Sequence, residues 1–407
     1  MRIGEFAKTN NISIDTVRHY MELGLILPTK SNGQYTFGKS CQSSITEVFL
    51  LKDMGFKLSE IKTILMFNLL GNMTSYQKDD YYNMLFEDKY LSVIEEIKHL
   101  DSVKEKLENQ LKELSAHKHE KNFTIGIGLS SIEKLSCLKC HSSLSIKNGE
   151  IVDNQVINGT LTCTCGEQYT IDDGILMMAD GILDDTTSFN QQYVTNYISS
   201  TDTRYLENIY QGIDRIQRII PFDTLHGKAL LELGTGVGFT LRNIYHLLPD
   251  DCLYIAVDHD ITRHKFLKNI LEKSDIKKNI LFICADFKEI PIQHESIDFL
   301  IDYSGTSNYS FDHTEFLLNE VNRYTKADCK LASTYILFKK FGLNSLIEDK
   351  YRSNFILENI KDNLKKLNYQ AIDEKTSIPL NKGGMYEDYF VEGEEVYFYQ
   401  FYGQRLG

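Results

Sequence analysis

Near the middle of the chain stands the sequence Leu230-Leu231-Glu232-Leu233-Gly234-Thr235-Gly236-Val237-Gly238-Phe239. The apolar run from Ala229 to Leu233 predicts a buried parallel strand, and a helical pattern follows from Thr240 to Leu248. A strand, a glycine-rich turn and a helix in this order let a ligand lie against bare backbone at the N-terminus of the helix. The dinucleotide fingerprint Gly-x-Gly-x-x-Gly would require glycine at position 239, which is Phe239, so the spacing favours another ligand class.

Acidic residues accompany the strands that follow. The second expected strand ends at Asp258, about 20 residues beyond Gly238, where a carboxylate can accept hydrogen bonds from both ribose hydroxyls of a nucleotide; Asp260 is the nearby alternative. The third strand leads to Asp286, and the fourth leads into a polar loop that starts at Tyr303. The alternation of strands and helices predicts a doubly wound, Rossmann-like sheet.

This combination of loop and carboxylates resembles the class I S-adenosylmethionine-dependent methyltransferases. The resemblance implies that the cofactor is S-adenosylmethionine, with Glu232 near its methionine end, Asp286 accepting from its adenine amine and Phe287 beside the ring. The candidate cofactor contacts are Glu232, Gly234, Thr235, Gly236, Gly238, Asp258, Asp286, Phe287 and Tyr303. The runs 371–377 and 396–402 resemble the closing antiparallel strand pair of that fold. The alternative is a Rossmann-like domain that binds no nucleotide, because fold does not ensure function.

A tyrosine-rich helical pattern, from Asn190 to Ile219, precedes the glycine stretch. Its tyrosines are Tyr193, Tyr197, Tyr205 and Tyr210. The segment either folds over the ligand site or is a plain packing helix. No catalytic residue is assigned, because methyl transfer needs little beyond an aligned nucleophile. DNA base methylation is not expected, since Asp302-Tyr303-Ser304-Gly305 stands where amino-directed DNA methyltransferases carry Asn/Asp-Pro-Pro-Tyr.

The first 72 residues have the pattern of a winged helix-turn-helix. A short helix from Ile3 to Lys8, a polar turn, and a second helix from Ile14 to about Glu22 are expected, with Ser13 as the N-cap of the second. The second helix of such a motif enters the major groove. Asn32-Gly33 is a hairpin signal, so residues 29–37 are expected to form a wing.

Four segments of this region resemble the MerR family of transcriptional regulators. They are Ile3-Gly4-Glu5-Phe6-Ala7, Thr16-Val17-Arg18-His19-Tyr20, Gly24-Leu25-Ile26-Leu27-Pro28 and Met54-Gly55-Phe56-Lys57-Leu58-Ser59-Glu60-Ile61. The resemblance implies a dimer that distorts promoter DNA. The candidate DNA contacts are Ser13, Thr16, Arg18, His19, Tyr20 and Tyr35. The chain departs from the family in its wing, which reads Gly33-Gln34-Tyr35 where Gly-Tyr-Arg is usual. The alternative is a small helical bundle that binds protein instead of DNA.

Residues 73–121 predict a long dimerisation helix. Neither proline nor glycine occurs from about Tyr76 to His119. Apolar residues recur with the heptad spacing of a coiled coil, at Phe86, Val93, Leu100, Leu107 and Leu114. A dimer suits the DNA-binding module, because two-fold operators need two-fold proteins. The alternative is a single helix packed on its own chain.

Residues 122–182 contain a cysteine cluster of Cys137, Cys140, Cys163 and Cys165. Four thiolates from two knuckles suit tetrahedral structural zinc, and the segment resembles the zinc ribbons that accompany some methyltransferases. The second knuckle departs from that pattern, because it is Cys-x-Cys where Cys-x-x-Cys is expected; His141 could substitute as a ligand. The alternatives are a degenerate ribbon without metal and a redox dithiol.

Composition sets bounds on partners and location. The formal net charge of −13 argues against wholesale coating of nucleic acid, but not against one local DNA-binding module. No apolar run has transmembrane length, and the N-terminus lacks the apolar core of a signal peptide, so we expect a cytoplasmic protein with no membrane partner. The lone cysteines Cys284 and Cys329 are expected in the core.

These patterns together predict a multidomain α and α/β chain. The expected parts are a MerR-type winged helix-turn-helix over 1–72, a coiled-coil helix over 73–121, a zinc-ribbon-like segment over 122–182 and a methyltransferase-like domain over 183–407. The expected function is a homodimeric regulator of promoter DNA, with RNA polymerase at the promoter, that methylates a small molecule and couples ligand or cofactor state to DNA binding. One alternative is a non-catalytic sensor of S-adenosylmethionine or a related metabolite. The other is an rRNA-type methyltransferase with an accessory DNA-binding head.

Overall fold

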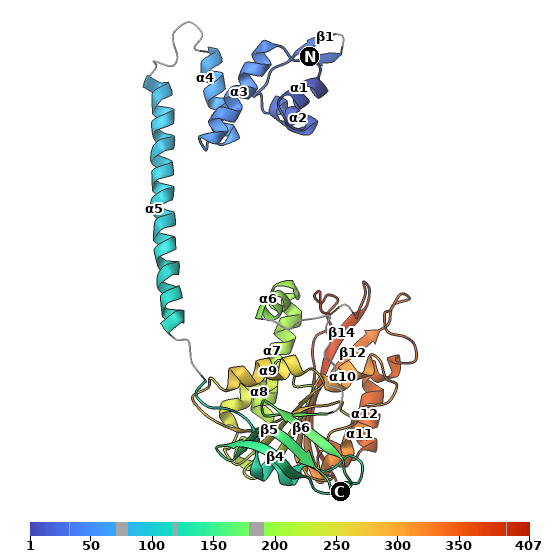
Figure 1. Cartoon of the computed structure of the whole chain (residues 1–407). Helices are drawn as coiled ribbons and strands as arrows, with labels where there is room; N and C mark the ends of the chain where they lie inside the picture. The colour runs from blue at the N-terminus through green and yellow to red at the C-terminus, as the bar shows by residue number, and fades with distance from the viewer. Residues whose placement is uncertain (32, 71–79, 117–120, 179–190, 388) are drawn as a thin grey trace. The chain divides into compact units, whose positions relative to one another are not determined.

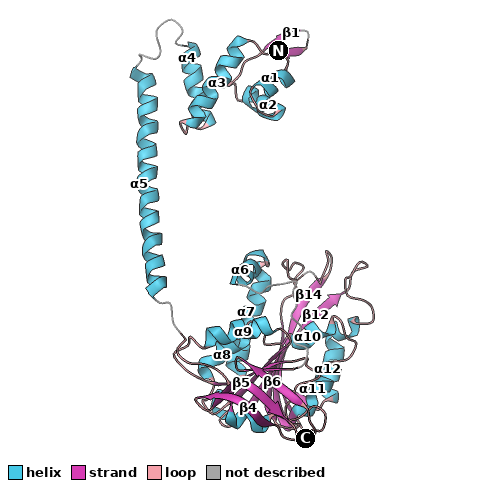
Figure 2. Ribbon diagram, viewed as in Figure 1, coloured by secondary structure: helices cyan, strands magenta, loops and turns pink. Residues whose placement is uncertain are grey.

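The computed structural model describes residues 1–31, 33–70, 80–116, 121–178, 191–387 and 389–407 (Figure 1). The chain divides into two compact units, Met1–Lys118 and His119–Gly407. The first unit is helical apart from one short hairpin, and the second is a mixed sheet with helices (Figure 2). This confirms the predicted fold class. Among the described helices, none combines the length and apolar character needed to cross a bilayer.

The first unit contains a helix-turn-helix, a hairpin and three further helices. Its elements are α1 Ile3–Thr9, α2 Ile14–Glu22, β1 Thr29–Ser31, β2 Gln34–Thr36, α3 Lys39–Asp53, α4 Leu58–Leu70 and α5 Asp80–Ala116. Ser13 caps α2, because its hydroxyl accepts a hydrogen bond from the backbone N–H of Thr16 at 3.0 Å. The rings of Phe6 and Phe37 stack at 4.7 Å and hold α1 against the chain that leaves the hairpin. Asn32, in the expected hairpin turn, lies outside the described residues.

Helix α5 carries the heptad stripe along its exposed surface. Near its start, Phe86 packs edge-on against Phe56 at 5.2 Å and joins the core of the first unit. Further along, Leu100, Leu107 and Leu114 are 57%, 61% and 60% exposed in the single chain. Thus the described residues of this chain leave that stretch of apolar side chains uncovered.

The second unit is built on one sheet of twelve strands. The strands are β3 Ile127–Gly128, β4 Ser145–Val152, β5 Gln155–Thr162, β6 Gln168–Asp172, β7 Ile175–Met177, β8 Ala229–Leu233, β9 Leu253–Asp258, β10 Asn279–Cys284, β11 Ile297–Tyr303, β12 Thr325–Lys340, β13 Tyr369–Thr376 and β14 Glu395–Arg405. The α-helices are α6 Gln191–Ser200, α7 Thr203–Ile219, α8 Phe239–Ile244, α9 Ile261–Leu271, α10 Gly305–Ser310, α11 Leu318–Val321 and α12 Leu357–Lys366. Short 3₁₀ turns occupy Leu129–Lys134, Phe222–Thr224, Tyr245–Leu247, Asn322–Tyr324 and Arg352–Phe355.

The strand order explains where a ligand can bind. Across the main part of the sheet the order is β13-β14-β12-β11-β8-β9-β10, and β8 to β12 are all parallel while β14 runs antiparallel to both neighbours. The chain moves one way from β8 through β9 to β10 and the other way from β11 to β12. The order therefore reverses beside β8, and open α/β sheets bind ligands at the carboxyl ends of strands at such a reversal.

Alternate residues of the strands feed two separate cores. Ala229, Leu231 and Leu233 of β8 belong to one buried cluster, and Leu230 between them belongs to the other. The first cluster includes side chains of α10, α11 and α12, and the second includes side chains of α7, α8 and α9. Helices thus cover both faces of the sheet, as a doubly wound fold requires.

The cysteine-bearing segment continues the same sheet. Strand β7 pairs in parallel with β10, in the register Phe282 with Ile175 and Cys284 with Met177. From β7 the sheet proceeds antiparallel through β6 to β5, which pairs with both β3 and β4. The segment that sequence analysis set apart at 122–182 is therefore hydrogen-bonded into the α/β sheet.

Candidate functional site

The glycine loop follows β8, whose five residues are all buried. Gly234, Gly236 and Gly238 have φ angles of 68°, 54° and 79°, a region that favours glycine. Packing imposes a second requirement on Gly238, because a Cβ there would lie 2.3 Å from Cδ1 of the buried Leu267 in α9. The loop therefore presents bare backbone, and Gly238 also allows α9 to approach closely.

Asp258, at the end of β9, organises this loop. Its side chain is 3% exposed; Oδ2 accepts a hydrogen bond from the N–H of Gly236 at 2.8 Å, and Oδ1 accepts from the N–H of Asp260 at 2.9 Å. A carboxylate has about four acceptor positions, so each oxygen retains one for a ligand. Asp260, the sequence-based alternative, instead caps α9 by accepting from the N–H of Thr262 at 2.8 Å. Of the two carboxylates, only Asp258 lines the cavity described next.

The first cavity, of about 610 Å³, lies against the carboxyl ends of the strands and takes Gly234 and Asp258 into its wall. Asp286 and Phe287 also line it; an Asp286 oxygen accepts from the N–H of Lys288 at 2.8 Å, and the carboxylate is exposed. The remaining lining residues are Met178, His259, Arg263, Cys284, Ala285, Glu289, Gly305, Asn308, Tyr309, Asp312 and His313. The structure thus brings Gly234, Asp258, Asp286 and Phe287, four candidates distant in sequence, to one cavity.

A second cavity, of about 250 Å³, also lies against the glycine loop. It is lined by the candidates Glu232, Gly234, Thr235, Gly236 and Tyr303, and the hydroxyl of Tyr303 donates to the carbonyl oxygen of Ile209 at 2.8 Å. Gly238 lines neither cavity and acts through packing. Gly234, Arg263 and Asn308 line both cavities, so the two spaces adjoin.

Glu232 is buried in β8, where a charged carboxylate is costly. Burial raises its pKa to about 7, although the hydroxyl of Tyr254, which donates to Oε2 at 2.8 Å, opposes that shift. Glu232 is 2% exposed and lines only the second cavity. A carboxyl in this position can accept a hydrogen bond from a ligand ammonium group.

Aromatic side chains from distant segments close the second cavity. Eight of its lining residues are aromatic: Tyr193, Tyr197, Tyr205, Phe239, Tyr303, Tyr386, Tyr389 and Phe398. The tyrosine-rich helices supply three of them, whereas Tyr210 is 69% exposed and lies outside the lining. Sequence analysis missed Tyr386, Glu387, Tyr389 and Phe398, and no local motif marks them.

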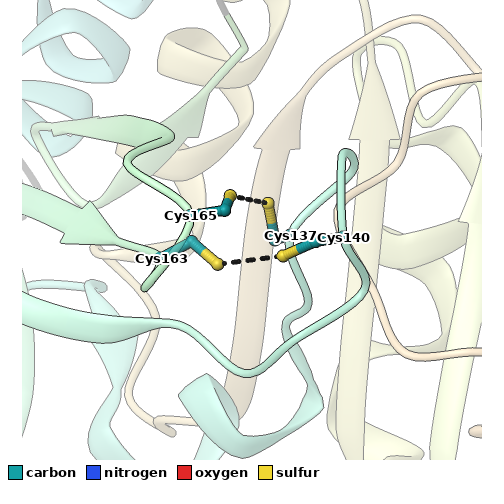
Figure 3. A group of neighbouring side chains, drawn as sticks. All are labelled: Cys137, Cys140, Cys163 and Cys165. Carbon is teal, nitrogen blue, oxygen red and sulfur yellow. Dashed lines mark hydrogen bonds between the residues drawn. The ribbon is translucent and has the colours of Figure 1, made fainter.

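The four cysteines of the cluster come together where the segment 137–140 meets the turn between β5 and β6 (Figure 3). Their sulfur atoms all lie within 4.8 Å of one another, with Cys137 to Cys165 at 3.5 Å and Cys140 to Cys163 at 3.3 Å. Zinc–sulfur bonds of about 2.3 Å in a tetrahedron place sulfurs about 3.8 Å apart, so the donor set fits zinc. His141 lies outside this group, with its ring 4.9 Å from that of His294.

The protonation equilibria of the four thiols favour binding of a cation to the cluster. Burial raises the pKa of Cys137, but hydrogen bonds from Tyr169 and from backbone N–H groups lower it to about 6. For Cys165, the N–H of Glu167 lowers the pKa, yet burial and the neighbouring thiols raise it to about 12. Negative charge on one sulfur thus opposes ionisation of another, and a bound divalent cation would relieve that opposition.

The DNA-contact candidates occupy different environments. On α2, Arg18 and His19 are exposed, and Arg18 forms an ion pair with Asp15 at 3.0 Å. Ser13 and Thr16 hydrogen-bond to each other through their hydroxyls at 2.8 Å at the start of the helix. In the hairpin, Tyr35 is 44% exposed and pairs across the strands with Lys30.

Tyr20 differs from the expectation that it faces DNA. It is 3% exposed and belongs to the core, where Lys52 donates a hydrogen bond to its hydroxyl at 3.3 Å. The physical reason is helical spacing, because Tyr20 follows the buried Val17 by three residues and shares its face. Tyr20 therefore supports α2 from within.

Comparison with known proteins identifies the first module. Residues 1–67 match the model of the MerR HTH family regulatory proteins. Over 67 residues the chain is 34% identical to the heavy metal-dependent transcription regulator 2 of Rhizobium meliloti (strain 1021), a match that covers 16% of this chain and 46% of that protein. The chain thus spans about half the length of the curated relative it matches. The N-terminal region is a MerR-type helix-turn-helix domain, as the sequence motifs predict.

Solved methyltransferases are among the structures similar to part of this chain. One is phosphoethanolamine N-methyltransferase 2 of Haemonchus contortus in complex with S-adenosyl-L-methionine, 14% identical with a TM-score of 0.39, covering 59% of this chain and 62% of that one. Another is a SAM-dependent methyltransferase from Aquifex aeolicus, 16% identical with a TM-score of 0.35, covering 54% of this chain and 100% of that one. At these scores the likeness assigns neither an activity nor a ligand to this chain.

Proposed function

We propose that this chain is a cytoplasmic DNA-binding regulator whose second unit binds S-adenosylmethionine and transfers its methyl group to a small molecule. The observation that carries the proposal is the pair of adjoining cavities on the glycine loop. One of about 610 Å³ contains Asp258, and the other of about 250 Å³ contains Glu232. A cofactor placed across Gly234 would have its nucleoside in the first cavity and its reactive end toward the second.

The side chains present suit such a cofactor. Asp258 retains one acceptor position on each oxygen, which matches the two hydroxyls of a ribose. Asp286 offers an exposed carboxylate for an adenine amine, and Phe287 an apolar ring for its plane. Glu232 offers a buried acceptor for the methionine ammonium group.

The adjoining cavities favour transfer of a methyl group to a second molecule over a site that only binds the cofactor. When bound, S-adenosylmethionine supplies an electrophilic methyl group on a sulfonium. The second cavity would place a partner molecule beside Gly234, and such alignment is the main requirement of methyl transfer. The carboxylates of Glu232 and Glu387 in this cavity disfavour a polyanionic acceptor such as RNA.

Isothermal calorimetry with S-adenosylmethionine and S-adenosylhomocysteine tests the cofactor. The intact protein should bind both at about one per chain. Absence of binding to a folded, monodisperse protein would overturn the assignment of the first cavity. Binding without methyl transfer to any tested acceptor would favour the non-catalytic sensor.

DNA recognition is assigned to α2 and the hairpin. Arg18 is the test residue because its side chain is 64% exposed on α2. Its matched control is Arg218, which is 73% exposed and also paired with an aspartate on its own helix, α7. Arg18→Ala should weaken binding to a duplex selected by the protein from random DNA by roughly tenfold and lower the salt dependence, whereas Arg218→Ala should not. Equal affinities for the two variants would contradict this role of α2.

Dimerisation is assigned to the exposed stripe of α5. Leu107→Glu places a charge in the centre of that stripe, and Lys106→Glu changes the adjacent exposed position. Light scattering should give a dimer for the wild type and Lys106→Glu and a monomer for Leu107→Glu. A dimer for both variants would refute the coiled coil. RNA polymerase is the expected partner at the promoter, and footprinting would show joint occupancy.

Helix α9 offers a route that couples the cofactor cavity to the chain entering from the first unit. At its N-terminus, the cap residue Asp260 donates its N–H to Asp258. At its C-terminal end, Glu272 forms an ion pair with Lys121 at 2.6 Å and accepts a hydrogen bond from the N–H of Ile125 at 2.9 Å. A ligand that shifts Asp258 therefore acts on the helix that anchors residues 121–125.

Coupling requires that the ligand bind two states with different affinity, and the effect must be reciprocal. S-adenosylmethionine should change the affinity for the selected duplex by about fivefold or more, and the duplex should change cofactor affinity by the same factor. Glu272→Gln should reduce both factors while leaving each ligand able to bind. Unchanged DNA affinity at saturating cofactor and acceptor would refute the coupling.

A further inference from the structure

The side chains of the second cavity indicate which kind of methyl acceptor can bind there, whereas the glycine loop does not. Its wall combines eight aromatic residues with the carboxylates Glu232 and Glu387. Arg263 is the single cationic residue among the described lining, and its Nε is 3.0 Å from Asp260. No histidine or lysine occurs among the residues described in this wall. The local chemistry is therefore that of a site for positive charge.

The aromatic rings of the wall are inclined to one another. Tyr386 lies 4.8 Å from Tyr193 and 5.7 Å from Tyr197, with its plane inclined by 57° and 38° to theirs. On another side, Tyr205 meets Phe398 edge-on at 5.3 Å. Inclined rings present electron-rich faces from several directions, which suits a compact cation better than a flat ring.

Glu387 fixes part of this wall and adds negative charge. It is 6% exposed, and its Oε2 accepts from the N–H of Gly384 at 2.9 Å and from the hydroxyl of Thr201 at 3.3 Å. Burial and the nearby Glu387 carboxylate raise the pKa of Tyr197. The carboxylate thus joins the end of α6 to the loop that carries Tyr386, and so holds the rings in place.

From this cavity we propose that the methyl acceptor is a small amine. The proposal rests on the proposed function, because it concerns the partner of the same cofactor. The bound ammonium first releases one proton to water, and the nitrogen lone pair then forms the new N–C bond while the C–S bond breaks and its electron pair stays on sulfur. The positive charge passes from sulfur to nitrogen, so the product is a methylated ammonium.

The wall suits this reaction and not transfer to a hydroxyl or thiol. A single positive charge is present before and after the step, so aromatic faces and carboxylates stabilise it throughout. A hydroxyl or thiol acceptor brings no positive charge to these aromatic faces and carboxylates, and the described wall contains no histidine or lysine. Burial raises the pKa of Tyr303, so its hydroxyl stays protonated at neutral pH.

An isosteric pair of probes tests the cavity directly. Hexylamine is protonated at neutral pH, and hexan-1-ol has nearly the same shape without charge. When the homodimer is saturated with S-adenosylhomocysteine, calorimetric titration should show that hexylamine binds at least tenfold more tightly than hexan-1-ol. Equal binding would overturn the proposal, because it would make the cavity merely apolar.

Substitutions in the cavity wall test which side chains cause the preference for the amine over the alcohol. Tyr386→Leu should abolish most of the preference for the amine, Tyr386→Phe should keep it, and Glu387→Gln should reduce it. Tyr210→Leu, on the exposed side of α7, should leave it unchanged. A preference that survives both Tyr386→Leu and Glu387→Gln in folded protein would place the amine elsewhere and refute the assignment.

A transfer assay separates this inference from the proposed function. With S-adenosylmethionine labelled in its methyl group, label should enter hexylamine and not hexan-1-ol, hexanethiol or p-cresol. Label in p-cresol or the thiol alone would overturn the amine proposal while upholding methyl transfer. If the cofactor fails to bind, the proposed function falls, and the amine-to-alcohol ratio measured without cofactor still decides the charge preference of the cavity.

Discussion

Replacement of Asp258 by alanine should abolish tight binding of S-adenosylmethionine. The carboxylate is 3% exposed and holds the N–H groups of Gly236 and Asp260 at 2.8 and 2.9 Å. Hydrogen bonds to a charged acceptor contribute about 1.5–3 kcal/mol each. Two ribose hydroxyls would therefore contribute roughly 3–6 kcal/mol, which corresponds to about 10²–10⁴ in Kd. Loss of loop order adds to this effect.

The measurement is calorimetry at one salt concentration, accompanied by thermal unfolding of each variant. Asp251→Ala is the matched control, since Asp251 precedes the same strand at its other end and is exposed beside His226. It should bind the cofactor as the wild type does. A Kd for Asp258→Ala within about threefold of wild type, in folded protein, would refute the assignment of this carboxylate to the ribose.

Three further predictions concern the frame of the site. Gly238→Ala should lower the free energy of unfolding by about 1–3 kcal/mol, because it adds both a clash with a buried leucine and a strained φ of 79°. The control is Gly227→Ala, which has a φ of 65° and open space around the new Cβ, so it should show the effect of strain alone. Urea unfolding measures both variants. Cys140→Ser should reduce bound zinc from about one per chain and lower Tm, while His141→Ala should retain the metal, as measured by elemental analysis and thermal unfolding. The pKa of Glu232 is about 7 in the folded protein against 4.5 for a free carboxyl, so the folded state binds the proton more tightly than the unfolded state does. The free energy of unfolding should therefore fall as pH rises from 4.5 through 7. Glu232→Gln should remove up to about 3 kcal/mol of this pH dependence, and identical pH profiles for the two proteins would contradict the prediction.

The sequence predicts those parts of the site that depend on short stretches. Strand β8 is apolar at every position but one, and its glycines have the spacing that the backbone angles require. Asp258 and Asp286 were predictable because parallel strands bring their carboxyl ends to one edge. Arg18 and His19 were predictable as exposed from the same helical periodicity that, applied more strictly, would also have placed Tyr20 inside.

The rest depends on contacts between distant segments. Tyr193 and Tyr386 lie 4.8 Å apart although nearly half the chain separates them, and neither position has a local signature. The pairing of β7 with β10 likewise joins residues more than a hundred positions apart. Such contacts form only when the whole sheet is assembled, so no short stretch of the sequence predicts them.

The parallel pairing of β7 with β10 has a consequence for the state of the cysteines. Strand β10 reads Asn279-Ile280-Leu281-Phe282-Ile283-Cys284, and without β7 its outer backbone groups would form the open edge of the sheet. An apolar edge strand of this kind recruits other chains. We therefore expect that oxidation of the four thiols would release this segment from β10, and that the first sign of the release would be aggregation of the protein.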